Sequence, residues 1–214
     1  TDYVDLYLIH WPDPATPLDD VAASLESLVA AGKARAVGVS NFTGAQLRQL
    51  AGAMTSTRPA ANQVSFSLFD RRWADDTFGA CRDLGVAVMA YGPLAHGLLG
   101  GAITRETVFD ETDWRAAGVI FGQSLLTPEN RNQNLTVVDR LRDLATGKGA
   151  TLAQLAIAWV LRHDPVAVAL VGARNEREIA EAAGATAVQS TNDDVQVIEK
   201  IMAEAVGMTT VLPT

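Results

Sequence analysis

The chain has 214 residues, of which 48% are hydrophobic and 20% are charged, as is typical of a soluble globular protein. A formal net charge of −8 and the lack of a basic cluster argue against nucleic acid as a partner. No apolar run reaches the roughly 18–20 residues of a membrane span, and no charged-then-apolar leader is visible. The lone cysteine, Cys81, excludes an intrachain disulfide and is expected to be a small buried side chain of a cytoplasmic protein.

The first predicted strand, Val4–His10, is an apolar run that ends on a histidine. Continuous hydrophobic residues are typical of a parallel strand that is buried on both faces, and α/β barrels place their chemistry at the carboxyl ends of such strands. His10 is therefore a candidate catalytic residue, and a core histidine with a hydrogen-bonding role is the structural alternative. Because the run lies at the start of the sequence, we expect the chain to begin inside a domain.

Apolar strands and amphipathic helices alternate along the rest of the chain. Further strands are predicted over Ala34–Ser40, Asn62–Ser65, Val86–Tyr91 and Val166–Val171. Helices are predicted over Asp19–Ala31, from Thr43 as N-cap, over Trp73–Leu84 with Gly85 closing it, over Asn134–Ala145, over Thr151–Arg162, after Arg174 through Ala183, and near Asp193–Val206. A long Gly-rich loop, about 92–130, interrupts this rhythm, and loops of that length are usually functional or disordered.

Five strands that are each followed by a helix predict a parallel sheet with helical crossovers. A barrel of eight such units takes about 250 residues, so the chain would supply about five-eighths of an α/β, (β/α)8 TIM barrel. An open doubly wound sheet is the alternative, but residues 10–13 (His-Trp-Pro-Asp) replace the Gly-rich fingerprint of a Rossmann unit. Residues 1–214 are thus predicted to form one partial barrel domain. With its strand edges open, the isolated chain is expected to be poorly stable or to recruit another chain.

Polar or glycine residues end each predicted strand, and in a barrel they would converge on one mouth. They are His10, Ser40, Asn41, Gln63, Tyr91 and the segment Gly172–Arg174. The segments around them are Asp5–Pro12, Val37–Phe42, Asn62–Val64, Ala90–Leu94 and Val171–Arg174. Together these segments resemble the aldo-keto reductase superfamily, in the right order and over essentially the whole chain. The resemblance is greatest to the microbial branch near the β-subunits of potassium channels.

The resemblance implies an NADPH-dependent oxidoreductase that reduces aldehydes or ketones to alcohols by hydride transfer. The chain would supply barrel strands four to eight, the last five βα units, and roughly 100 preceding residues would complete the barrel. The family takes its catalytic aspartate, tyrosine and lysine from that preceding part, so the isolated chain is expected to be inactive. His10 would orient and polarise the carbonyl oxygen, and Trp11 would wall the substrate pocket.

The resemblance also assigns the nicotinamide end of the cofactor. Ser40, Asn41 and Gln63 would hold its carboxamide, because side-chain hydroxyl and amide groups supply paired donors and acceptors. Tyr91 would stack on the nicotinamide ring. Taken alone, a Ser-Asn pair after a strand is common turn chemistry, and a tyrosine at a strand end is more often a core residue.

The resemblance implies that two later segments bind the pyrophosphate and the adenosine end of the cofactor. Glycines let backbone amides approach phosphate oxygens, so the pyrophosphate contacts would be Gly92, Pro93, Leu94, Ala95 and Gly97. Within this stretch, Gly92 stands where many relatives have serine, and His96 is expected to be a solvated loop residue.

The segment from Gly172 onward would meet the adenosine end. Arg174 would clamp a 2′-phosphate, and Glu181 matches the residue that reads the adenine amino group. Glu178 stands where relatives often carry arginine or glutamine, and its carboxylate would repel a phosphate. Ala182 stands in place of an adenine-binding asparagine. On the strength of Arg174, NADPH is the expected cofactor. Glu178 and Ala182 depart from the family pattern, so NADH is left open.

Two other functions stay open on the sequence. One is a non-catalytic nicotinamide-binding sensor that acts through partner contacts, as channel β-subunits do, and the other is an inactive fragment. The expected partner is a small carbonyl substrate; neither nucleic acid, a membrane nor a metal is expected, and an oligomer is left open. Trp114 and Phe121, in the long loop, either close over cofactor or substrate or anchor the loop itself.

Overall fold

The computed structural model describes residues 1–212 and resolves them into two compact units. The first unit contains Thr1–Ser65, Trp73–Tyr91 and Asp164–Val168. The second contains Phe66–Arg72, Gly92–His163 and the described residues from Ala169 onward. The expectation of a single partial barrel domain over residues 1–214 stays a prediction.

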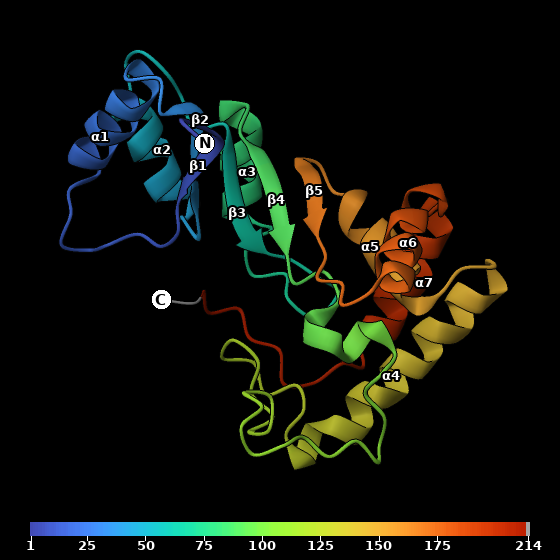
Figure 1. Cartoon of the computed structure of the whole chain (residues 1–214). Helices are drawn as coiled ribbons and strands as arrows, with labels where there is room; N and C mark the ends of the chain where they lie inside the picture. The colour runs from blue at the N-terminus through green and yellow to red at the C-terminus, as the bar shows by residue number, and fades with distance from the viewer. Residues whose placement is uncertain (213–214) are drawn as a thin grey trace. The chain divides into compact units, whose positions relative to one another are not determined.

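A five-stranded sheet in the order β1-β2-β3-β4-β5 runs through the first unit (Figure 1). The strands are β1 Val4–Ile9, β2 Ala34–Ser40, β3 Ala61–Ser65, β4 Ala87–Tyr91 and β5 Val166–Leu170, of which the last extends into the second unit. β1 to β4 pair in parallel, with Ser40 opposite Gln63 and Ser65 opposite Tyr91. The α/β fold class and the five strands predicted from the sequence are confirmed. Parallel pairing brings the carboxyl ends of β1 to β4 to one edge.

Three helices of the first unit pack one against the next in chain order: α1 Leu18–Ala30, α2 Gly44–Ala53 and α3 Asp76–Leu84. Thr43 caps α2 as predicted, because its hydroxyl accepts from the Gln46 N–H while the Gln46 side chain accepts from the Thr43 N–H. α3 begins at Asp76 rather than at the predicted Trp73. The Trp73 indole is instead buried in the preceding turn and donates to Ser65 Oγ at 3.2 Å.

Gly85 ends α3 in the left-handed conformation, at φ 65°, as its position in the sequence predicted. Cys81, on the same helix, is fully buried in the core of the first unit. Burial raises the pKa of its thiol to about 11, with smaller opposing effects from Asn62, Arg82 and Arg48. This side chain is therefore the small buried residue that the sequence predicted.

β1 departs from the expectation of a strand buried on both faces. Tyr3, Val4 and Tyr7 are all more than 40% exposed. The physical reason is position, since β1 lies at one edge of the sheet and is paired on one side only within the described residues. The open strand edge expected of a partial barrel is thus present in the first unit.

The second unit is built mainly from helices. They are η1 Ala95–Gly100, α4 Pro128–Gly147, α5 Leu152–Leu161, α6 Glu176–Ala183, η2 Gly184–Ala187 and α7 Asn192–Met202. α4 begins at Pro128, before the predicted Asn134, since proline suits the first turn of a helix. Thr151 caps α5 as predicted, with Gln154 as its reciprocal partner. Trp159 and Leu155 of α5 lie in the core of this unit.

Within the described residues, no single helix has both the length and the apolar composition to cross a membrane. The consecutive helices α4 and α5 meet both criteria only when they are taken together, and they are bent by 88°.

A buried arginine joins three separate segments of the second unit. Arg72, whose side chain is 2% exposed, pairs with Asp70 through Nε to Oδ1 at 2.8 Å and Nη2 to Oδ2 at 2.7 Å. Its Nη1 donates to the main-chain carbonyls of Phe121 and Val211, both at 3.0 Å. The long loop and the C-terminal segment are therefore held by one guanidinium.

Candidate active site

Asn41 is the centre of a hydrogen-bonded cluster at the carboxyl ends of the strands in the first unit. Its Nδ2 donates to the main-chain carbonyl of His10 and to Ser40 Oγ, each at 3.0 Å. Its Oδ1 accepts from the Tyr91 hydroxyl at 3.1 Å. Residues after β1, on β2 and on β4 are thereby brought together by one amide side chain. Asn41 lies in the left-handed region, at φ 62°, which asparagine tolerates better than most residues.

β3 completes this cluster through its backbone. The main-chain carbonyl of Gln63 accepts from Ser40 Oγ at 2.8 Å and from the Asn41 N–H at 2.9 Å. Ser40 and Asn41 are buried, whereas the Gln63 and Tyr91 side chains are half-buried. The four predicted nicotinamide-binding residues, Ser40, Asn41, Gln63 and Tyr91, are therefore gathered at one place.

His10 follows β1 directly and its side chain is exposed. The main chain of His10 is fixed by Asn41, so this strand-end position is held although the imidazole remains open to a ligand. Trp11 is also exposed, and its ring centroid lies 6.2 Å from that of His10 at an interplanar angle of 47°. The two residues thus form an accessible pair of rings beside the cluster.

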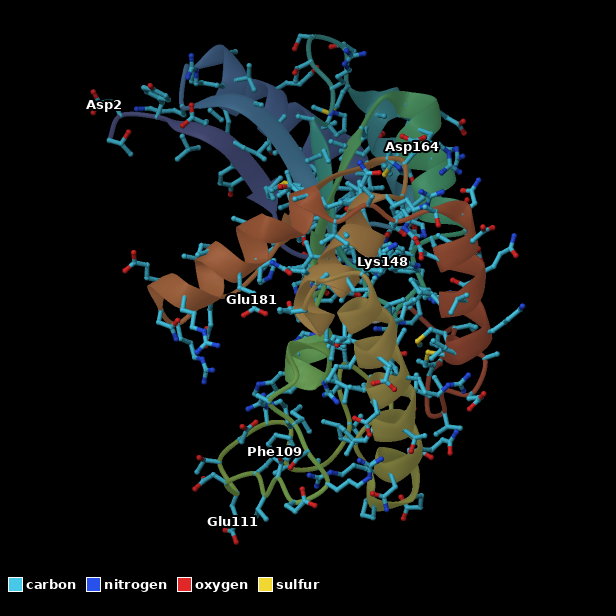
Figure 2. All side chains as sticks on the ribbon, turned by 90° about the vertical axis from the view of Figure 1, so that its right-hand side faces the viewer. Asp2, Phe109, Glu111, Lys148, Asp164 and Glu181 are labelled. Atoms are coloured by element: carbon cyan, nitrogen blue, oxygen red, sulfur yellow. The ribbon has the colours of Figure 1, made fainter. Side chains whose placement is uncertain are left out.

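The second unit contains a cavity of about 730 Å³, within the range of small-molecule and cofactor sites. Its lining comes from the Gly-rich loop after β4, from the long loop, from α5 and from the β5–α6 connection. Figure 2 labels two of the lining residues, Phe109 on the long loop and Glu181 on α6. The predicted contacts that line it are Gly92, Pro93, Leu94, Gly97, Gly172, Arg174, Glu178 and Glu181. Ala95 is buried in the loop and is not part of the lining.

The Gly-rich loop has the backbone that its glycines predicted. Gly92 and Gly97 have φ values of 65° and 106°, and Ala95 and His96 between them also have positive φ, at 46° and 54°. Non-glycine residues with positive φ are uncommon, and they cluster at functional sites where the surroundings hold them in place. The Ala95 N–H donates to the Gly92 carbonyl and the Gly97 N–H to that of Leu94, which keeps the loop tight.

His96 is not the solvated loop residue that the sequence suggested. Its half-buried ring lines the cavity and packs against Trp114 and Phe121, with centroid distances of 5.2 and 4.8 Å. Burial lowers the pKa of His96, with Asp70 opposing and Arg115 reinforcing the shift. The positions of Trp114 and Phe121 favour the loop-anchoring alternative left open for them.

Arg115 is a cavity residue that sequence reasoning missed. Its Nη2 and Nε bind the two carboxylate oxygens of Asp113 at 2.6 and 2.9 Å, and its Nη1 donates to the His96 carbonyl at 3.2 Å. Its guanidinium also lies 4.9 Å from the centroid of the Phe109 ring. Arg115 therefore links the long loop to the Gly-rich loop across the cavity wall. The -Asp-x-Arg- spacing was the only sequence signal, and it is too common to have identified the residue.

Arg174 and Glu178 form an ion pair at the start of α6. Arg174 Nη2 lies 2.8 Å from Glu178 Oε1, and the Arg174 main-chain N–H donates to Glu178 Oε2 at 2.7 Å. The Arg174 side chain holds the pKa of Glu178 below its ordinary value, and the main-chain hydrogen bond adds to this effect. The predicted phosphate clamp is thus paired with a neighbouring carboxylate.

No atom lies within 4 Å of the position that a Cβ on Gly172 would take, so the backbone there is open to a close approach. Within residues 1–212, no group of three or more His, Cys, Asp and Glu side chains is arranged to hold a metal ion.

Parallel strands with polar residues at their carboxyl edge are typical of the α/β class of proteins, which includes the α/β barrels. The chain belongs to the aldo/keto reductase family, whose sequence profile matches residues 1–203. Its sequence is 32% identical to that of the aldo-keto reductase YhdN of Bacillus subtilis, over 97% of this chain and 62% of that protein. It is 28% identical to the NADH-specific methylglyoxal reductase of Escherichia coli, over 95% of this chain and 60% of the relative.

A solved structure shares the fold. The glycerol dehydrogenase AKR11B4 of Gluconobacter oxydans matches with a TM-score of 0.87 and 31% sequence identity, over 100% of this chain and 62% of that one. The chain therefore supplies part of the family's barrel, and it spans about three-fifths of the length of these relatives.

Proposed function

We propose that a polypeptide carrying this chain is an NAD(P)H-dependent oxidoreductase that reduces aldehydes or ketones to alcohols. The observation that carries the proposal is the 730 Å³ cavity, lined by a glycine-rich loop and by the start of α6. Such a surface suits the phosphate and adenosine parts of a nicotinamide cofactor, because backbone N–H groups of glycine-rich loops bind phosphate oxygens. Family membership supports the same assignment.

The cluster around Asn41 would hold the nicotinamide carboxamide. Both hydrogens of Asn41 Nδ2 are engaged, by His10 and Ser40, so Asn41 would act through its Oδ1, which has a second lone pair beside the one used by Tyr91. A carboxamide NH2 would donate to that oxygen, and the Gln63 side chain would serve as a further partner. The Tyr91 ring, with its hydroxyl fixed, would stack on the nicotinamide.

His10 would act on the substrate. A reduced nicotinamide bound in this site would supply hydride to a carbonyl carbon, which would leave negative charge on the carbonyl oxygen. The imidazole of His10, exposed at a strand end, would donate a hydrogen bond to that oxygen, and Trp11 beside it would line the pocket of an apolar substrate. The resemblance assigns the general acid that protonates the oxygen to sequence outside these residues.

Cofactor binding is tested on a polypeptide that carries this chain together with the preceding part of the barrel, by titrating it with NADH and with NADPH and following nicotinamide fluorescence. Gly172→Glu would place a carboxylate in the cavity and should abolish saturable binding. Gly52→Glu is the matched control, because Gly52 lies on α2 and likewise has no atom within 4 Å of its Cβ position. If the unmodified polypeptide bound neither cofactor saturably, or if Gly172→Glu left binding undiminished, the proposal would be refuted.

Carbonyl reduction is tested on a longer polypeptide that carries this chain together with the preceding part of the barrel. We expect oxidation of the reduced cofactor in the presence of a small aldehyde such as methylglyoxal. His10→Ala should lower kcat by about 10²-fold, the scale of one positioned donor to a developing oxyanion. Tight cofactor binding without turnover in that polypeptide would instead favour the nicotinamide-binding sensor.

A further inference from the structure

We infer that the cavity of the second unit selects NADH over NADPH, and that Glu178 is the residue that makes the selection. The inference rests on the proposed function, which assigns the phosphate and adenosine parts of the cofactor to the cavity that the start of α6 lines. The two cofactors differ only by a phosphate on the adenosine ribose. The pyrophosphate is common to both cofactors and contributes equally to both affinities. The ratio of the two affinities therefore measures the effect of the added phosphate alone.

Glu178 already pairs with the Arg174 guanidinium, the positive group that a ribose phosphate would need. Its two carboxylate oxygens are divided between the guanidinium and the main-chain N–H of Arg174, at 2.8 and 2.7 Å. A phosphate that approached Arg174 would have to displace a carboxylate or share the guanidinium with it. Like charges brought together in this way weaken binding strongly.

The Glu178 carboxylate has a second hydrogen-bond donor besides the guanidinium, the main-chain N–H of Arg174. Arg174 has a side chain that is 85% exposed, so its ion pair is weak and the side chain is free to swing toward a ligand. The Glu178 side chain is only 32% exposed and is also held by the Arg174 N–H, while its own N–H donates to Asn175 Oδ1 at 3.0 Å. A phosphate bound by the swung guanidinium would still meet the negative charge of Glu178.

Among the other described residues that line the cavity, none supplies a free positive charge to offset the carboxylate of Glu178. Arg115 is the other guanidinium there, and both of its donor edges are committed to Asp113 and to the His96 carbonyl. The lining carries two further carboxylates, those of Asp110 and Glu181. Carboxylates thus outnumber guanidinium groups, and burial, which lowers the pKa of His96, keeps that ring from adding positive charge at neutral pH.

The test compares the affinities of a polypeptide that carries this chain and the preceding part of the barrel for NADH and NADPH, measured by fluorescence titration at fixed ionic strength. We expect NADH to bind about tenfold more tightly or better. Glu178→Gln keeps the size and the hydrogen-bonding capacity of the side chain but removes its charge. That variant should raise the affinity for NADPH relative to the affinity for NADH by about tenfold. Glu176→Gln, on the same turn of α6 but outside the cavity lining, should leave the preference unchanged.

A second measurement needs no variant. Because the discrimination is electrostatic, raising the salt concentration should narrow the NADH-to-NADPH ratio of the unmodified polypeptide. Equal or tighter binding of NADPH by the unmodified polypeptide would overturn the inference while leaving the proposed function intact, as would a ratio that Glu178→Gln does not change. Binding of neither cofactor would overturn the proposed function itself.

Discussion

The Tyr91 hydroxyl donates a hydrogen bond to the amide oxygen of Asn41 at 3.1 Å, which ties the end of β4 to the end of β2. β3 lies between these strands in the sheet, so the bond passes over an intervening strand. Asn41 is 3% exposed, and its amide has little access to water as a substitute partner. The bond therefore contributes to the stability of the first unit as well as to the orientation of the tyrosine ring.

Tyr91→Phe removes this donor while the aromatic ring stays. The buried amide oxygen of Asn41 loses a partner, so we expect a loss of about 1–2 kcal/mol in the free energy of unfolding, measured by urea denaturation. Tyr7→Phe is the control, because Tyr7 is 42% exposed on β1 and should change stability by no more than about 0.5 kcal/mol. Equal effects of the two substitutions would contradict this account of the cluster.

The Arg72–Asp70 pair predicts a much larger effect in the second unit. Arg72→Met removes the guanidinium that pairs with the buried carboxylate of Asp70 and binds two main-chain carbonyls, which should cost about 3–5 kcal/mol. Arg105→Met breaks a pair with Asp139 in which both side chains are over 40% exposed, and should cost at most about 1 kcal/mol. Thermal unfolding of the two variants checks the difference, and a small effect of Arg72→Met would show that water replaces the guanidinium.

A comparison of two glycines in the long loop distinguishes the cost of backbone strain from the cost of a steric clash. Gly118 and Gly122 have φ values of 73° and 78°, so alanine is strained to a similar degree at both. A Cβ on Gly118 would also lie within 2.7 Å of backbone atoms of Leu126, whereas nothing lies within 4 Å at Gly122. Gly118→Ala should therefore destabilise the chain by about 1–3 kcal/mol more than Gly122→Ala does. Chemical denaturation gives both values, and equal losses would argue against the close approach at Gly118.

Glu26 predicts a specific acid dependence of stability. Main-chain and hydroxyl donors of Thr55–Thr57, chiefly the Ser56 N–H, lower the pKa of Glu26 from 4.5 to about 2. A pKa that is lower in the folded state gives stability that is present above pH about 4.5 and is lost as the pH falls through about 2. Glu26→Gln should therefore flatten the decline of stability in this window. Glu111→Gln, in an exposed loop, removes a carboxylate without touching the Thr55–Thr57 turn and serves as the control in the same acid titration.

Local signals account for what the sequence predicted well. Thr43 and Thr151 cap their helices because each precedes a glutamine at the reciprocal position, and Gly85 ends α3 because a left-handed residue was needed there. The strand ends likewise follow from short apolar runs. The residues around Asn41 were expected together from the family resemblance, but its hydrogen bonds to three strand ends depend on tertiary structure.

Long-range contacts account for what the sequence did not predict. His96 was expected in solvent because nothing near it in sequence buries it, whereas Trp114 and Phe121 approach it from a later part of the long loop. β1 was expected to be buried because its composition is apolar, yet burial depends on whether a neighbouring strand is present. The Arg174–Glu178 pair had a local signal in its four-residue spacing, which favours ion pairs on helices, but its main-chain hydrogen bond had none.

The burial of Cys81 makes the chain convenient for site-specific labelling. A thiol with a pKa near 11 in the core of the first unit reacts poorly with maleimides, so the natural cysteine need not be removed. A reporter cysteine at Val108, which is 91% exposed on the long loop and lines the cavity, would then be the single reactive thiol. A fluorophore placed there would report directly on how the cavity rim responds to each cofactor.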